Sequence, residues 1–419
     1  MAEFNRRRFL EGSALFGGAL AARVPVAAAA PPRGDLPNLA ASATPISVGE
    51  RLARIANAQR LMRDAGVGAL LIEAGSSLVY FTGIEWWRSE RMTAALIPAE
   101  GDAIVITPFF EAPSIRESLA IPAEIRTWNE DEKPLALAAG WLKERKLDNR
   151  PVAIEETVRN FIVDGLQHAL PGVTIVSGAP VVRGCRMHKS AAEIALMRTA
   201  SDITIAAFRH TAPRIERGMT PQDIGRMIQE ATTAMGGESD LPLVLLGEAS
   251  AYPHGSGKPQ QVRDGEIVLI DGGCTVHGYT SDISRTFVFG EPSKAQREVW
   301  DRVHHGQEIA LEAARIGAAA GSVDDKVRAW YSSLGYGPGY KLPGLSHRTG
   351  HGIGMDGHEP VNLVHGETTL LEAGMCFSNE PGIYIPGSFG IRLEDCFHMT
   401  EQGPRWFSTP PPSIENPFG

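Results

Sequence analysis

The chain has 419 residues, 43% of them hydrophobic and 21% charged, which is the composition of an ordinary folded protein with room for two or more buried cores. Its formal net charge is -9, and no run rich in Lys and Arg follows the N-terminus. This charge provides no basic face to attract phosphates, so we expect no nucleic acid partner.

The N-terminus has the order of features that is typical of an export signal. Arg6 and Arg7 precede an uncharged run at residues 12–22, and a group of alanines then offers an A-x-A-like cleavage site. The uncharged run is too short and too weakly apolar to span a membrane, so an integral membrane protein is not expected. The arginine pair resembles a twin-arginine signal, which predicts export to the periplasm or out of the cell. We assign residues 1–30 to this signal, with a disordered basic tail as the alternative, and residues 31–45 to a linker.

Residues 46–182 alternate between helical and strand-like patterns. Leu52, Ile55 and Met62 recur at helical spacing, and an apolar strand follows at residues 67–72. Further strands and helices alternate after it, and this alternation predicts an N-terminal α/β domain.

The segment TGIEWWRSER places Trp86, Trp87 and Arg88 directly after a strand of this domain. These residues could form a rim that faces the substrate, offered to a partner subunit. The preferred interpretation is that the aromatic residues belong to the core at a strand end.

A second domain is predicted for residues 190–405, followed by a Pro-rich tail at residues 406–419. Ser190 and Glu193 have the spacing of a capping box at the start of a long helix. Groups of helices beside glycine-punctuated strands predict an α+β architecture, and no repeat with a period of 20–50 residues is present.

The cysteines are expected to be buried thiols. They are too few and too scattered for a disulfide scaffold or a CxxC metal site. An oxidising compartment would permit a bridge without requiring one. The chain contains Cys185, Cys274, Cys376 and Cys396.

Two aspartates flank a glycine pair in the second domain. Asp271 ends an apolar strand, and Asp282 lies eleven positions later in a second strand-like run. A hairpin, or two closely folded strands, would bring both carboxylates to one place. The alternative is that Asp271 only forms a turn, because Asp-Gly-Gly is common at strand ends.

Two glutamates occur near the C-terminus. Glu380 precedes a Pro-Gly turn, and Glu394 lies in an apolar run that is expected to return beside it. A glutamate in such a run is costly to bury unless it is paired or bound to metal. The alternative is a plain ion pair between Arg392 and Glu394 on an exposed strand face.

The segment HRTGHGIGMDGHEP contains three histidines, His347, His351 and His358. Seven positions separate His351 from His358, so the two would face opposite sides of an unbroken strand, and the glycines argue against a helix. We therefore do not expect these two histidines to form an adjacent pair of ligands.

Carboxylates with a single imidazole form a donor set that suits hard or borderline divalent metals such as Mn²⁺ or Co²⁺, with Zn²⁺ also compatible. Two divalent ions would balance the charge of four carboxylates. The sequence therefore predicts a dinuclear site with Mn²⁺ as the preferred ion. The carboxylates are Asp271, Asp282, Glu380 and Glu394.

The segments IDGG to SD, HGIGMDGHEP, NEPGIY and GIRLED occur in this order, and together they resemble the pita-bread metallopeptidases. This family includes methionine aminopeptidases, Xaa-Pro aminopeptidases and prolidases. The preceding α/β domain is similar to a creatinase-type N-terminal domain, which favours the Xaa-Pro branch. The resemblance implies that five residues bind two metal ions, with the second and last of them bridging: Asp271, Asp282, His351, Glu380 and Glu394.

The resemblance also assigns further roles around the metals. Glu380 would take a proton from the attacking water and pass it to the leaving nitrogen, while His254 and His358 would stabilise the tetrahedral intermediate. Arg392 would orient a ligand carboxylate or meet a substrate carboxylate, with a structural salt bridge as the alternative. His347 is assigned to the pocket wall.

The implied activity is hydrolysis of the Xaa-Pro bond of peptides or dipeptides by a metal-bridged hydroxide, in a homodimer or higher homo-oligomer. Proline at P1′ needs a dedicated pocket because it has no N–H and its ring fixes φ. The sequence does not separate an aminopeptidase from a dipeptidase. The alternatives are a metal-dependent hydrolase or lyase of the same fold that acts on a small non-peptide molecule, and a metal-free binding module.

Overall fold

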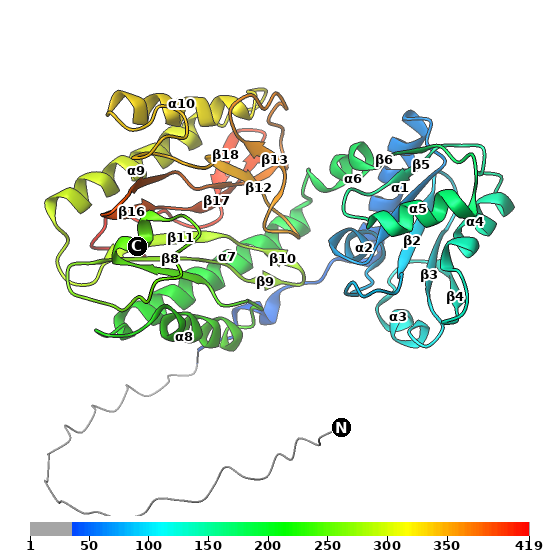
Figure 1. The fold of residues 1–419 in the computed structure, drawn as a ribbon, viewed down its shortest axis with the longest axis horizontal. Coiled ribbons are helices and arrows are strands. Elements are labelled where there is room, and N and C mark those ends of the chain that lie inside the picture. The colour runs from blue at the N-terminus through cyan, green and yellow to red at the C-terminus, as the bar shows by residue number, and fades with distance from the viewer. Residues whose placement is uncertain (1–35, 419) are drawn as a thin grey trace, which may run out of the picture. The chain divides into compact units, whose positions relative to one another are not determined.

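A computed structural model describes residues 36–418 of the chain (Figure 1). The predicted export signal lies outside the described residues, and so does the beginning of the predicted linker. Among the described residues, no helix has the length and apolar character needed to cross a membrane.

The first half of the described chain is built on a six-stranded mixed sheet with the strand order β4-β3-β2-β1-β5-β6. The central strand β1 runs parallel to β5 and antiparallel to β2. Every residue of β1, β2 and β3 is buried, as expected for apolar strands that are covered on both faces. The strands are β1 (Ala69–Glu73), β2 (Ala94–Pro98), β3 (Ala103–Pro108), β4 (Ala123–Trp128), β5 (Val152–Ile154) and β6 (Ile175–Ser177).

Six α-helices accompany this sheet and confirm the predicted α/β architecture (Figure 1). The Ser47 side chain caps the first helix by accepting the N–H of Glu50. The first strand starts at Ala69, two residues after the expected start, because Val67 still bonds back to the end of the helix. The helices are α1 (Val48–Asp64), α2 (Ser76–Thr82), α3 (Ala112–Ser118), α4 (Pro134–Glu144), α5 (Asn160–Ala169) and α6 (Ala179–Arg186).

The tryptophan pair after α2 divides between core and surface. Trp86 packs against the hydrophobic core, as the preferred interpretation expected. Trp87 stacks on it with a centroid separation of 4.9 Å and is 72% exposed, so the core interpretation is wrong for this residue.

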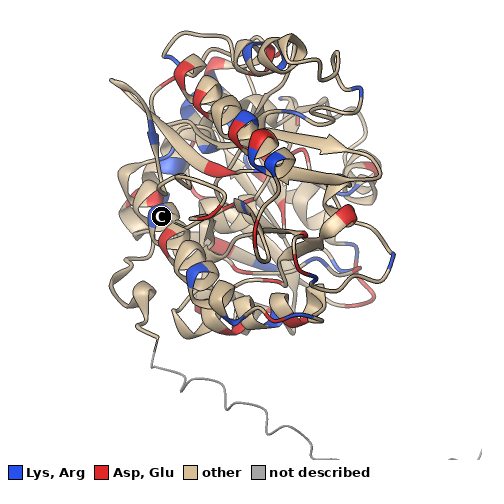
Figure 2. Ribbon diagram, turned by 90° about the vertical axis from the view of Figure 1, so that its left-hand side faces the viewer, with Lys and Arg blue, Asp and Glu red and all other residues tan. Residues whose placement is uncertain are grey.

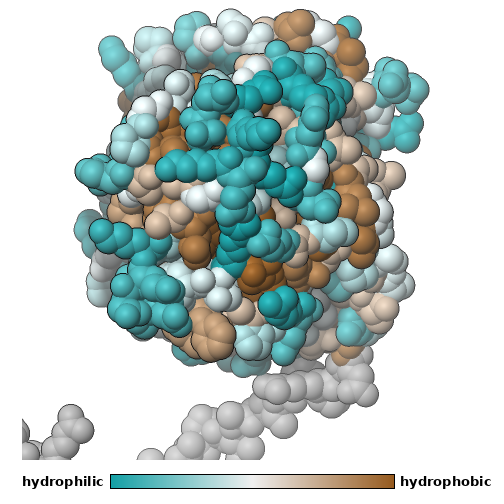
Figure 3. All heavy atoms as spheres, turned by 90° about the vertical axis from the view of Figure 1, so that its right-hand side faces the viewer, coloured by the Kyte–Doolittle hydropathy of each residue, from teal (hydrophilic) through white to brown (hydrophobic). Residues whose placement is uncertain are grey.

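The face shown in Figure 3 is mainly hydrophilic, with hydrophobic areas between the polar side chains.

The second half begins with a long helix, α7, which starts with the predicted capping box. The Ser190 side chain accepts the N–H of Glu193, and the Glu193 carboxylate accepts the N–H of Ser190. Basic and acidic residues alternate along the helices in Figure 2, and α9 carries the exposed pair Lys294–Glu298. The helices are α7 (Ala191–Thr211), α8 (Pro221–Ala234), α9 (Lys294–Ala313) and α10 (Gly321–Ser333), with short 3₁₀ turns η2 (Ala212–Arg214) and η3 (Gly247–Ala251); a further 3₁₀ turn, η1 (Leu39–Ser42), precedes α1 in the chain.

The strands of this half form several antiparallel sheets. The larger two have the orders β11-β8-β7 and β13-β12-β14-β17-β18. Helices and antiparallel strands together form the predicted α+β arrangement. The strands are β7 (Leu243–Leu246), β8 (Ile267–Gly272), β9 (Thr275–Val276), β10 (Tyr279–Thr280), β11 (Ile283–Val288), β12 (Gly350–Gly352), β13 (Glu359–Leu363), β14 (Cys376–Asn379), β15 (Gly382–Ile385), β16 (Phe389–Arg392), β17 (Asp395–Thr400) and β18 (Gly403–Trp406).

The cysteines confirm their predicted environment. All four are buried and free, and none forms a disulfide. Burial raises the pKa of the Cys185 and Cys376 thiols to about 12, so these groups stay protonated and unreactive at neutral pH.

A buried ion pair joins the two sheets that carry the acidic residues. Arg285 on β11 lies 2.7 Å from Asp395 on β17, and neither side chain is exposed. The Gln307 amide donates a further hydrogen bond to Asp395. Because Asp395 directly follows Glu394, this pair fixes the position of a predicted metal ligand relative to β11.

We predict that Arg285→Met lowers the free energy of unfolding by about 3–5 kcal/mol, because it leaves the Asp395 carboxylate buried without its charged partner. Urea unfolding of the full chain measures this difference. The matched control is Arg297→Met, which removes a partly exposed arginine paired with Glu415 and should cost at most about 1 kcal/mol. An equal decrease in the free energy of unfolding of both variants would contradict the prediction.

Candidate metal centre

The hairpin formed by β8 and β11 brings the two aspartates together. Gly272 pairs with Ile283 and Asp271 pairs with Ser284, so Asp271 and Asp282 lie at the same end of the hairpin. The apolar residues before Asp271 are buried, which places the carboxylates where the sheet opens to a cavity. The turn-only alternative for Asp271 is therefore wrong.

The two glutamates lie at the ends of the paired strands β14 and β17. Asn379 pairs with Asp395, so the residues beside them, Glu380 and Glu394, emerge next to each other. Glu394 also bonds to Ser284 through its backbone, which connects β17 to the hairpin of the aspartates. Four carboxylates that are far apart in the sequence thus reach one place.

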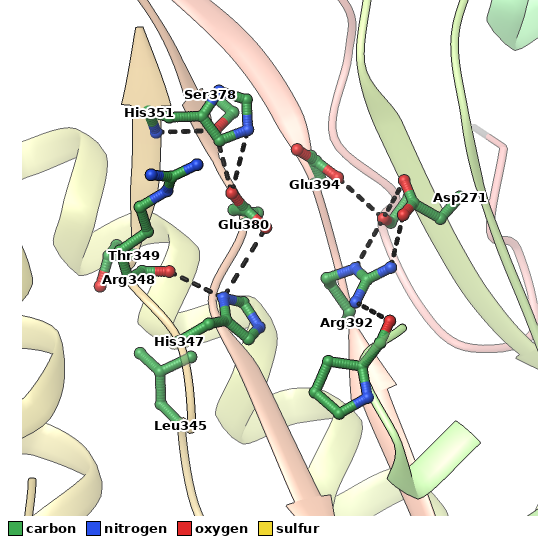
Figure 4. A network of polar contacts seen from close by, with 12 residues as sticks. Asp271, Leu345, His347, Arg348, Thr349, His351, Ser378, Glu380, Arg392 and Glu394 are labelled. Atoms are coloured by element: carbon green, nitrogen blue, oxygen red, sulfur yellow. Dashed lines mark hydrogen bonds and ion pairs between the residues drawn. The ribbon is translucent and has the colours of Figure 1, made fainter. Parts of the chain in front are cut away.

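Glu394 is buried rather than on an exposed strand face, with 2% of its surface exposed. Arg392 does not pair with it in the described structure and instead contacts Asp271, with the Nη2–Oδ2 distance at 2.5 Å. The guanidinium also donates to the Ser284 hydroxyl and the Pro253 carbonyl (Figure 4). The alternative of an exposed Arg392–Glu394 pair is therefore wrong, and Arg392 forms its salt bridge with Asp271, a predicted ligand.

His351 on β12 has the orientation of a metal ligand. Its Nδ1 lies 3.1 Å from the carbonyl oxygen of Gly352, which can only accept, so the proton is on Nδ1. The other nitrogen, Nε2, faces the carboxylates, 3.2 Å from Glu380 and 3.8 Å from Asp282, where it can donate a hydrogen bond to Glu380 when protonated and bind a metal ion when not. A backbone partner that fixes the tautomer in this way is typical of metal-binding histidines.

His351 and His358 are neighbours, with ring centroids 4.1 Å apart, so the premise that strand alternation keeps these two predicted site residues apart is wrong. The physical reason is that the chain turns between them. His351 lies on β12, and Glu359, the residue after His358, pairs with Gly352 on the antiparallel strand β13. The two histidines do not lie on one strand, so the odd number of positions between them does not place their side chains on opposite faces.

The other predicted site residues line the same cavity. The His347 ring bonds to the Tyr384 hydroxyl at 2.7 Å and lies 3.8 Å from Glu380. His254 lies on the loop after η3 and is exposed. The cavity has a volume of about 320 Å³ and is lined by His254, Asp271, Asp282, His347, Arg348, His351, His358, Glu380, Arg392 and Glu394.

Simultaneous ionisation of all carboxylates in the cluster is unfavourable. Burial and the nearby Asp271 carboxylate raise the pKa of Asp282 to about 7. Burial, together with the charge of Asp282, raises the pKa of Glu394 well above its ordinary value. Loss of water around the charged form is the main physical cause, and repulsion between the carboxylates adds to it.

Glu380 behaves in the opposite way. Burial opposes its ionisation, but the hydrogen bond from His351 and the charge of His347 together lower its pKa to about 2. Burial alone would lower the pKa of His351, whereas the Glu380 carboxylate raises it on balance. These two residues therefore form a charged pair beside carboxylates that repel each other.

The residues fit a pair of divalent ions. Three groups of donors lie with their atoms within 4.8 Å of one another, and they overlap at Asp282, His351 and Glu394. Cations would remove the repulsion that raises the pKa values of Asp282 and Glu394. The oxygen-rich donor set with imidazole suits Mn²⁺, Co²⁺ or Zn²⁺.

Comparison with known proteins agrees with this geometry. The model of metallopeptidase family M24 matches residues 195–401, and the model of the creatinase/prolidase N-terminal domain matches residues 54–188. The probable dipeptidase PepE of Mycobacterium tuberculosis is 33% identical over 362 residues, which cover 84% of this chain and 92% of the relative. The chain belongs to metallopeptidase family M24.

M24 relatives with solved structures share most of the described fold. The dipeptidase PepE of Mycobacterium ulcerans aligns with a TM-score of 0.80 and 31% identity over 88% of this chain and 98% of the relative. The prolidase of Thermococcus sibiricus aligns with a TM-score of 0.79 and 27% identity over 86% and 97%. The Xaa-Pro dipeptidase of Lactobacillus helveticus is 32% identical over 364 residues, or 84% of this chain and 95% of the relative. The M24 fold confirms a pita-bread domain after a creatinase-type domain.

Three residues at the candidate site were not predicted from the sequence. The Ser284 hydroxyl lies 3.0 Å from Asp271 and 2.8 Å from Glu394, and the Tyr384 hydroxyl contacts both His347 and Arg392. Arg348 lines the cavity, and its position beside His347 was the only signal available for it.

We predict that Mn²⁺ raises the unfolding temperature of the wild-type M24 chain and that Glu394→Gln abolishes this effect. A ligand at about a hundred times its Kd stabilises the folded state by about 2.7 kcal/mol. Without metal, the variant should be at least as stable as wild type, because a repelling carboxylate is gone. Thermal unfolding in chelator and in excess Mn²⁺ measures both effects.

The control for this experiment is Glu372→Gln, which removes an exposed carboxylate paired with His188. It should keep the full metal-induced shift. A shift of wild-type size in Glu394→Gln would show that Glu394 does not hold metal.

Proposed function

We propose that this protein is a dinuclear-metal Xaa-Pro dipeptidase, with Mn²⁺ as the preferred ion. The observation that carries the proposal is the convergence of the five predicted ligand residues on one cavity, with three further histidines around them. The names of the relatives support the peptide substrate, because they include dipeptidases and an Xaa-Pro dipeptidase.

When bound, the metal ions would polarise the scissile carbonyl and lower the pKa of a water molecule. The chain's own residues then handle the proton and the developing charge. Glu380, held ionised by His351, is able to accept a proton and return it to the leaving proline nitrogen. His254 and His358 both line the cavity, where an N–H from either would stabilise an oxyanion.

His358 is suited to a neutral hydrogen-bonding role. Partial loss of water around the ring lowers the pKa of His358, although the side chain stays exposed, and the neighbouring charges of His351 and Arg348 lower this pKa further. A neutral imidazole at working pH retains one N–H to donate without adding positive charge beside the metals.

Arg348 favours a dipeptide over a longer peptide. Among the described residues its guanidinium has no hydrogen bond or ion pair, whereas the other arginine of the cavity, Arg392, is fully engaged (Figure 4). An unpaired cation in a cavity fits the free carboxylate of a short substrate, with both oxygens available for bidentate contact. In Xaa-Pro this carboxylate belongs to the proline itself.

An Xaa-Pro aminopeptidase is the second candidate, and one observation favours it. A neighbouring cavity of about 830 Å³ shares His254 with the metal site. This cavity would accept residues that follow the proline. The two candidates differ only in what lies beyond P1′.

Two measurements test the function. The first compares hydrolysis of Xaa-Pro with that of Xaa-Pro-Yaa-Zaa by the metal-loaded enzyme, and we expect the dipeptide to have the higher kcat/KM. The second repeats the assay after complete chelation and after Asp271→Ala, both of which should abolish activity. Activity that survives either treatment would contradict the metallopeptidase proposal, and a preference for the tetrapeptide would identify an aminopeptidase.

We predict that Arg348→Met raises the KM for Xaa-Pro by about 10-fold to 100-fold, because a charge-assisted hydrogen bond contributes about 1.5–3 kcal/mol. The KM for Xaa-Pro-amide, which lacks the carboxylate, should change little. Steady-state kinetics with both substrates measure the difference. Equal losses would show that Arg348 has no role in carboxylate recognition.

A further inference from the structure

The loop that carries His358 is closed by the side chain of Glu359. Its carboxylate accepts the N–H of Met355 at 3.0 Å and the N–H of Asp356 at 3.2 Å. A Cβ at Gly354 would lie 2.8 Å from both oxygens of this carboxylate, so a larger residue at this position would displace it. The conformation of residues 354–359 therefore depends on where the Glu359 carboxylate is held.

Two cations from outside the loop hold that carboxylate. Arg186 contacts Glu359 at 2.5 Å and Asp356 at 2.7 Å through the same nitrogen, Nη2. Lys189 contacts the other oxygen of Glu359 at 2.9 Å. Arg186 is the last residue of α6, which belongs to the N-terminal domain.

These contacts are shielded from water. The exposed fractions of the side chains are 11% for Arg186, 5% for Glu359 and 2% for Lys189. Burial opposes ionisation of Glu359, but the charges of Lys189 and Arg186 lower its pKa to about 2. Removal of one partner from a buried ionic group is much more disruptive than loss of an exposed pair.

Helix α2 of the N-terminal domain also contacts this loop. The Ser76 hydroxyl bonds to the Asp356 carboxylate, and Arg186 donates to the Ser77 hydroxyl at 3.1 Å. The Met355 side chain packs against the hydrophobic core of that domain. Charge, hydrogen bonds and apolar packing from one domain thus act on a loop of the other.

His358 itself has few restraints. Its side chain is exposed, and among the described residues its ring forms no hydrogen bond, only the contact with the His351 ring. The position of the His358 ring therefore follows from the position of the loop. Arg186 of the N-terminal domain contacts that loop through Glu359 and Asp356.

We propose that the N-terminal domain positions His358 for the substrate, with Arg186 and Glu359 as the positioning residues. The catalytic part of this inference rests on the proposed function, in which His358 meets the substrate. The domain is then a component of the active site and not only a neighbour of it.

The kinetic test is a double-mutant cycle with Arg186→Gln and His358→Ala in the metal-loaded full chain. A displacement of about 1 Å in an active site costs about 100-fold in rate, so we expect Arg186→Gln to lower kcat/KM by about 10-fold to 100-fold. In the His358→Ala background the same change should cost less than threefold, because the group that it positions is absent. Equal losses in both backgrounds, or no loss in wild type, would overturn the proposal.

The matched control is Arg183→Gln, one turn earlier on α6. Arg183 forms a bidentate pair with Glu156 within the N-terminal domain and does not touch the loop. The control removes the same charge from the same helix, and kcat/KM should stay within twofold of wild type. A loss as large as that of Arg186→Gln would attribute the effect to the helix and not to the loop.

A second readout does not depend on activity. Hydrogen exchange of the Met355 and Asp356 amides should accelerate at least tenfold in Arg186→Gln and in Glu359→Gln, and stay unchanged in Arg183→Gln. Unchanged exchange in the first two variants would overturn the positioning role. If wild type proves inactive on every Xaa-Pro substrate, the proposed function fails, while the exchange experiment still decides whether Arg186 holds the loop.

Milder variants keep the test decisive if Arg186→Gln fails to fold. Ser76→Ala removes one hydroxyl from the loop contact, and we expect a threefold to tenfold loss of kcat/KM in wild type and none in the His358→Ala background. Arg186→Lys keeps the charge at the loop and should restore slow amide exchange. A Ser76→Ala loss of the same size in both backgrounds would contradict the proposal.

Discussion

The placement of four carboxylates around one small cavity is the constraint on which the rest of the catalytic domain depends. Burial disfavours the charged form of each carboxylate and repulsion between them adds to this effect, which is why the pKa of Asp282 rises to about 7. A chain folds around such a cluster only if other interactions hold the carboxylates in place. Metal ions would later relieve a repulsion that the fold itself withstands.

The surrounding structure supplies those interactions with buried pairs. Arg285 and Asp395 lock β11 to β17 directly behind the site, with both side chains fully buried. Arg392 reaches across to Asp271, and the Ser284 hydroxyl bridges the carboxylates of Asp271 and Glu394. The hydrophobic core around these strands excludes water, which strengthens each of these contacts.

The same physical device recurs at the boundary between the domains. Glu359 is buried with Arg186 and Lys189, just as Asp395 is buried with Arg285. In each case the buried carboxylate directly follows a site residue in the chain: Asp395 follows Glu394, and Glu359 follows His358. The protein thus uses ionic contacts that water cannot screen to transmit position to functional side chains that face the cavity.

Much of this could be predicted from local sequence. The periodic apolar runs and the glycines and prolines between them predict the α/β and α+β parts, and the Ser190–Glu193 capping box is correctly located because caps depend only on neighbouring residues. The ligand residues could be predicted because their motifs resemble, in order, those of the pita-bread metallopeptidases, and because a glutamate in an apolar run is costly to bury unless it is paired or bound to metal. The role of Arg392 could not be decided in this way, since its partner Asp271 lies 121 positions away.

The sequence by itself determined which residue types carry the chemistry, and tertiary structure decided which of them meet. Strand alternation places His351 and His358 apart, but the turn into β13 brings their rings to 4.1 Å. Arg348 and Ser284 have no local signal, because a guanidinium without a partner or a bridging hydroxyl is defined only by what surrounds it. The link from Arg186 to His358 likewise required three dimensions, because it joins two domains through contacts between residues 170 or more positions apart.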